Sequence, residues 1–144
     1  WVMWLLDFFA VSMIIPTMAQ FLVSAGGSEE DYYLALVTTT GAQLVANLLV
    51  GLAVDFTGCV KGLYAPTCLL SILGGGLYAL ADAAAPLRCP GVIMAARMMT
   101  GAGTGKATLT FVVLARVPQA DRERWLVKLS TARSLGLFLG PALG

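Results

Sequence analysis

Residues 97–111 read RMMTGAGTGKATLTF, a run in which three alternate glycines precede a lysine. Glycines followed by lysine can cradle a phosphate group, so their spacing decides whether this stretch binds a nucleotide. A P-loop needs G-x-x-x-x-G-K-[ST], which would require a glycine where Thr100 stands and a hydroxyl where Ala107 stands. A dinucleotide fingerprint would require a glycine in place of Lys106. The spacing therefore predicts no nucleotide site.

Other residues that commonly carry catalysis are scarce. The chain has no histidine, which removes the most common metal ligand and the Ser-His and Cys-His nucleophile pairs. Cys59, Cys68 and Cys89 form no C-x-x-C pair and indicate neither a disulfide framework nor a zinc site. The net charge of +1 gives no reason to expect a nucleic-acid partner. We expect no enzyme activity and no cofactor or metal.

The composition instead indicates a membrane protein. Hydrophobic residues make up 58% of the 144 residues and charged residues 12%, against about 25% charged in soluble domains. A helix that crosses the hydrocarbon core needs about 20 mostly apolar residues, and the apolar runs here are continuous, unlike the alternating pattern of barrel strands. We expect an all-α polytopic transmembrane bundle with spans at about 1–23, 33–54, 62–85, 91–115 and 126–144.

Breakers and basic residues define the connections between these spans. The breakers are Gly26-Gly27, Gly58, Pro86 with Pro90, and Pro118. The second and fourth connections hold five basic residues, whereas the first and third hold only Arg88; the five are Lys61, Arg116, Arg122, Arg124 and Lys128. The positive-inside rule then places the second and fourth connections and the amino terminus in the cytoplasm. Because the sequence lacks an initiator methionine and ends within an apolar run, we expect a fragment.

Three of the ionisable residues inside the predicted spans are candidates for a functional role. Arg97 lies about six residues from the outer end of the fourth span, and placing a charge at that depth costs about 2.5–3.5 kcal/mol on insertion scales. Lys106 is also mid-span, and either snorkels or faces the same cavity as Arg97. Asp7 is the one acid deep in a predicted span, nearer its cytoplasmic end. We expect Asp7, Arg97 and Lys106 to line a pathway, with a structural ion pair as the alternative for Arg97.

The glycines of the opening stretch have a simpler explanation inside a span. Arg97, Gly101 and Gly105 are four residues apart and share one helix face. Gly101-x-x-x-Gly105 is the small-xxx-small spacing that lets membrane helices approach closely. We expect these glycines to be a packing surface.

The connection between the second and third spans reads GLAVDFTGCVK. It resembles the G-x-L-x-D-R-x-G-R-[RK] signature of the major facilitator superfamily, with Gly51, Asp55 and Gly58 at the matching positions. The first arginine is replaced by Phe56, and the basic pair is absent, with Lys61 one place late.

Three further patterns resemble the same family, in the expected order. Arg97 with the three glycines resembles its fourth-span arginine motif, and DFFAVSMIIP, with Asp7 and Pro16, resembles a first-span pattern of drug exporters. SLGLFLGPALG resembles the exporter motif G-x-x-x-G-P-x-x-G, matched by Gly136, Gly140, Pro141 and Gly144. The proline would kink the fifth span and the glycines would pack it against a neighbour.

The resemblance implies a bundle of twelve or more helices in two halves, of which this chain is an incomplete six-helix amino-terminal half. It implies a secondary transporter that moves a small solute by alternating access, with the missing carboxyl-terminal half of the same chain as partner. The exporter motif favours antiport, and Asp7 would be the proton carrier. A cytoplasmic gate would comprise Gly51, Asp55, Gly58, Lys61, Arg116, Asp121, Glu123 and Arg124.

Two alternatives remain open. In an anion-conducting, channel-like member of the same fold, similar to an endolysosomal branch of the family, Arg97 and Lys106 would be wall residues that attract anions. A non-transporting membrane protein would use the glycine faces to pack against a partner. The sequence indicates residence in a lipid bilayer without distinguishing a plasma membrane from an endolysosomal one.

Overall fold

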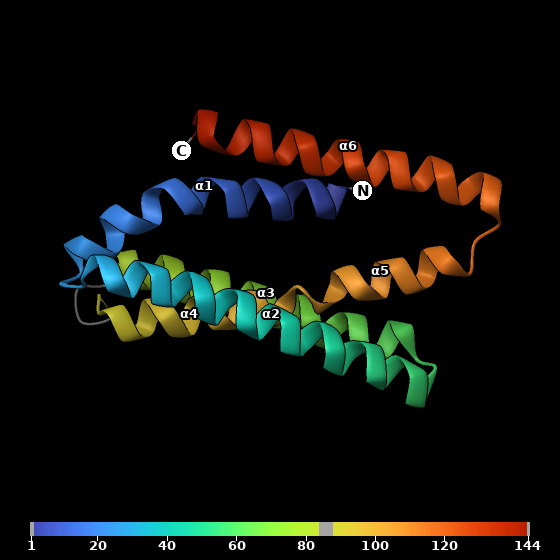
Figure 1. Ribbon diagram of the computed structural model, residues 1–144, viewed down its shortest axis with the longest axis horizontal. Coiled ribbons are helices and arrows are strands. Elements are labelled where there is room, and N and C mark those ends of the chain that lie inside the picture. Colours follow the sequence, from blue (N-terminus) through green and yellow to red (C-terminus); the bar gives the residue numbers. More distant parts are fainter. Residues whose placement is uncertain (1, 84–87, 144) are drawn as a thin grey trace. The chain divides into compact units, whose positions relative to one another are not determined.

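The structure is a computed structural model that describes residues 2–83 and 88–143. These residues form six helices: α1 (Val2–Ser24), α2 (Glu29–Thr57), α3 (Val60–Ala83), α4 (Pro90–Gly103), α5 (Gly105–Ala115) and α6 (Gln119–Leu143). No strand occurs in the described ranges. The predicted all-α class is therefore confirmed for them (Figure 1).

Three helices are long and apolar enough to cross a membrane: α1, α2 and the part of α3 from Val60 to Ala81. They correspond to the first three predicted spans. The sequence predicted five spans, and the other two differ in the structure. The predicted fourth span is divided between α4 and α5, which are 14 and 11 residues long. The predicted fifth span lies in α6, whose first half is charged.

The ends of α2 follow from local chemistry. The Ser28 hydroxyl accepts a hydrogen bond from the Asp31 backbone N–H at 3.3 Å, and the Asp31 carboxylate accepts one from the Ser28 N–H at 2.7 Å. This capping box starts the helix before the predicted residue 33. Gly58, with φ of 64°, ends it by donating its N–H to the Val54 carbonyl. Gly26, another predicted breaker, also has a positive φ, of 83°. The predicted breaker Pro86 lies outside the described residues.

Two compact units divide the chain, and each is described separately. One unit runs from Leu22 to Val113, and in it α4 packs against both α2 and α3. Glycine makes this packing close: a Cβ added at Gly101 would meet the backbone of Thr39 in α2, and one added at Gly103 would lie 2.7 Å from the Ser71 backbone nitrogen in α3.

The other unit joins α1, up to Phe21, to the chain from Leu114 onward. Within it, α1 and α6 lie side by side (Figure 1). A Cβ added at Gly136 would lie 2.8 Å from the Leu5 carbonyl oxygen, and one added at Gly140 would meet the Ser12 side chain. The Ser12 hydroxyl donates a hydrogen bond of 2.9 Å to the Gly136 carbonyl across this contact.

The predicted fourth span is interrupted at Thr104, so one continuous helix over 91–115 is not what the structure shows. The Thr104 N–H donates to the Gly101 carbonyl three residues earlier, as in a 3₁₀ turn, and the Ala107 N–H donates to Thr104 in the same way. The Thr104 hydroxyl also donates to Gly101, at 2.6 Å. Each glycine in the run lowers helix propensity by about 1 kcal/mol relative to alanine, which makes this the weakest part of the span.

Candidate functional site

The most unusual buried group in the 22–113 unit is the Arg97 guanidinium on α4. Arg97 is 4% exposed, and its Nε has no hydrogen-bond partner among the described residues. The Tyr78 side chain of α3 interacts electrostatically with the Arg97 guanidinium. A buried donor without an acceptor costs about 1–3 kcal/mol, and more when it is charged. Arg97 is therefore a cationic donor that the described packing leaves incompletely satisfied.

Lys106, in the first turn of α5, is the second buried cation of this unit, at 8% exposure. Its ammonium donates a hydrogen bond of 3.0 Å to the Ser71 hydroxyl on α3. Two residues further on, the Thr108 hydroxyl donates to the Asn47 side-chain oxygen on α2, at 2.9 Å. Side-chain hydrogen bonds thus tie α5 to both α2 and α3 in a stretch predicted to lie within the bilayer.

Asp7, the third predicted pathway residue, is half-buried in α1. It belongs to the unit that contains α1 and α6, whereas Arg97 and Lys106 belong to the other. Only Arg97 and Lys106 are therefore brought into one unit. Pro16 lies exposed within α1, which remains helical through it.

The residues predicted to form a cytoplasmic gate divide in the same way. Asp55 and Lys61 are exposed on either side of the turn between α2 and α3, and a Cβ at Gly51 would meet nothing within 4 Å. The structure records no ion pair for Asp55 with any described residue. The remaining gate residues are exposed around the connection from α5 to α6, in the other unit: Arg116, Asp121, Glu123 and Arg124.

The predicted packing glycines that the structure describes are found at helix contacts. In the unit from Leu22 to Val113, a Cβ at Gly105 would lie 2.8 Å from Val50 of α2, next to the Gly101 contact described above. Gly136 and Gly140 face α1 in the other unit. Pro141 lies within α6, and Gly144 is outside the described residues.

One basic residue has a structural role that the sequence analysis did not identify. Arg122 donates to the last carbonyls of α5 and the turn after it: Nε to Leu114 at 3.1 Å, and Nη2 to Ala115 at 2.8 Å and Val117 at 3.2 Å. These bonds cap the carboxyl end of α5. A basic side chain soon after a helix end was the available signal, but it was counted only toward membrane orientation.

No family model matches the chain, and no match to it was found among the curated proteins or the solved structures.

Proposed function

We propose that the chain supplies membrane spans of a secondary transporter, which moves a small solute across a bilayer by alternating access. The observation that carries this proposal is the Arg97 guanidinium, buried on α4 with its Nε unpartnered among the described residues. A charge held within a membrane costs several kcal/mol and is by default a sign of function. A solute or a titrating carboxylate that reaches Arg97 during the cycle would supply the missing acceptor.

The interrupted fourth span supports the same proposal. Transporters commonly form their solute sites where a membrane helix is discontinuous, because the break frees backbone groups and allows movement. Here the break at Thr104 lies between the two buried cations, Arg97 and Lys106.

The proposal is also supported by the order of the four sequence motifs that resemble those of the major facilitator superfamily. The proposed carrier would be completed by a carboxyl-terminal half, and Asp55 and Lys61 would belong to its cytoplasmic gate. Proton-coupled antiport would assign the proton to Asp7.

The anion-conducting alternative has one observation in its favour. Among the side chains that the structure describes in the 22–113 unit, the two buried charges, Arg97 and Lys106, are both cationic. A pore lined by them would attract anions without the coupled movements of a carrier.

The test is the dependence of flux on concentration in proteoliposomes that contain the full protein. Small organic cations such as ethidium and small anions such as succinate and chloride would be offered in turn. A rate that saturates with concentration supports the carrier, whereas a chloride current that is linear in voltage supports the channel. Absence of flux for every solute would favour a protein that packs against a partner.

A further inference from the structure

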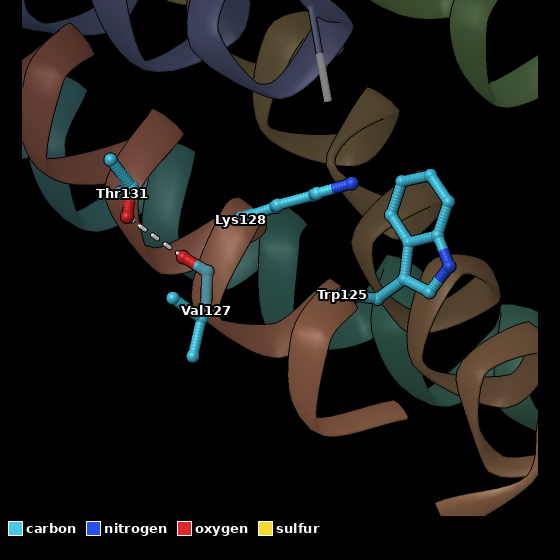
Figure 2. A pocket seen from close by; sticks show the side chains of 4 residues that line it. All are labelled: Trp125, Val127, Lys128 and Thr131. Atoms are coloured by element: carbon cyan, nitrogen blue, oxygen red, sulfur yellow. Dashed lines mark hydrogen bonds between the residues drawn. The ribbon is translucent and has the colours of Figure 1, made fainter. Parts of the chain in front are cut away.

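A hollow of about 460 Å³ lies on the surface of α6, lined by Trp125, Val127, Lys128 and Thr131 (Figure 2). All four residues belong to one helix, so the hollow is defined within a single unit. The buried cations discussed above belong to the other unit.

The walls of this hollow are apolar and its one charge is a cation. Val127 and Trp125 are 66% and 43% exposed, although both are hydrophobic. The Thr131 hydroxyl donates to the Val127 carbonyl at 2.9 Å, as the dashed line in Figure 2 shows, so its hydrogen is already used within the helix. The Lys128 ammonium lies 4.9 Å from the centre of the Trp125 ring, a cation–π distance.

The position of the hollow along α6 indicates its depth in a membrane. The six charged residues of α6 all lie between Asp121 and Arg133, whereas residues 134–143 carry none. The hollow occupies residues 125–131, just before Arg133, the last charged residue ahead of the uncharged residues 134–143, and so lies close to the boundary between charged and apolar sequence. Tryptophan is enriched at this boundary, and lysine reaches from it toward water and headgroups.

We propose that this hollow binds one phospholipid with an anionic headgroup. The Lys128 ammonium contacts the headgroup, Trp125 lies at the level of the glycerol backbone, and an acyl chain passes over Val127 and Thr131. A soluble anion would gain nothing from the apolar walls, and a zwitterionic lipid would bring no net charge to the lysine. Four basic residues against two acidic ones on α6 strengthen the preference; they are Arg122, Arg124, Lys128 and Arg133 against Asp121 and Glu123.

The experiment uses Trp125 as the reporter. The chain has three tryptophans, and Trp1→Phe with Trp4→Phe leaves Trp125 as the one fluorophore of this type. The protein is reconstituted with brominated phosphatidylglycerol or brominated phosphatidylcholine, each of which quenches tryptophan on contact. We expect the anionic lipid to quench Trp125 with about fivefold higher apparent affinity, the preference supplied by one lysine near a membrane surface.

The matched variants are Lys128→Gln, inside the hollow, and Arg116→Gln, an exposed cation outside it. Lys128→Gln should abolish the preference, and Arg116→Gln, which removes the same charge, should keep it. Equal quenching by the two lipids, a preference that survives Lys128→Gln, or no quenching by either lipid would overturn the proposal. If the tryptophan substitutions prevent folding, native mass spectrometry of the unaltered protein and Lys128→Gln gives the same test, since only the former should retain phosphatidylglycerol.

Discussion

The close approach of α4 to α2 makes a quantitative prediction about two glycines. A Cβ added at Gly101 would meet the carbonyl oxygen of Thr39 and lie 3.2 Å from its carbonyl carbon and 3.3 Å from its Cα. These are backbone atoms, which cannot rotate away, so Gly101→Ala must push α4 from α2. At Gly41, within α2, an added Cβ would meet nothing within 4 Å.

The magnitude follows from two opposing terms. Replacing glycine by alanine inside a helix stabilises it by about 1 kcal/mol, and this term is common to both variants. Overpacking against atoms that cannot yield costs about 1–3 kcal/mol, and only Gly101→Ala has this cost. We therefore expect Gly41→Ala to be neutral or stabilising, and Gly101→Ala to be less stable than Gly41→Ala by about 1–3 kcal/mol.

The free energy of unfolding can be measured by titrating the purified protein in mild detergent with sodium dodecyl sulfate and following helicity by circular dichroism. The comparison between the two variants removes the shared propensity term. Equal stability of the two, or greater stability of Gly101→Ala, would show that α4 and α2 do not pack through Gly101.

Two other contacts give smaller effects. Ser12→Ala removes the hydrogen bond to the Gly136 carbonyl and should lower the free energy of unfolding by about 0.5–1.5 kcal/mol. Thr17→Ala loses only hydrogen bonds within its own helix and should change the free energy of unfolding by less than about 0.5 kcal/mol. Equal effects of the two substitutions would argue against the contact between Ser12 and Gly136. Arg122→Ala removes the side chain that caps the carboxyl end of α5 and should speed proteolysis of the connection to α6 several-fold. Arg124→Ala, at an exposed position, should not change the cleavage rate. Identical cleavage rates for the two variants would contradict the capping role of Arg122.

Two turns between helices were predicted well from the sequence. Gly26 and Gly58 adopt positive φ where breakers were expected, because few other residues tolerate that conformation. The start of α2 was placed at 33 because only apolar residues were considered. The capping box at Ser28 and Asp31 was present in the sequence and extends the helix through its acidic first turn.

The interruption at Thr104 and the contacts across helices could not be predicted in the same way. A glycine run is compatible with a continuous, closely packed helix and with a broken one, and tertiary contacts decide between them. Ser71 and Asn47 were not predicted as partners of Lys106 and Thr108, because helical hydroxyl and amide groups often bond locally or face lipid. Arg97 was singled out from its position in a predicted span, but its burial and its unpartnered Nε depend on packing that sequence spacing does not specify.

The central claim is that Arg97 is kept for function and not for stability, and Arg97→Met tests it most directly. Methionine keeps an unbranched side chain as far as the position of the arginine Nε and carries no charge, so the variant should be as stable as the unaltered protein or more stable, by up to about 3 kcal/mol. Its solute flux in proteoliposomes should fall to background. A variant that loses stability by several kcal/mol, or one that keeps normal flux, would contradict the account and show that Arg97 is a structural residue.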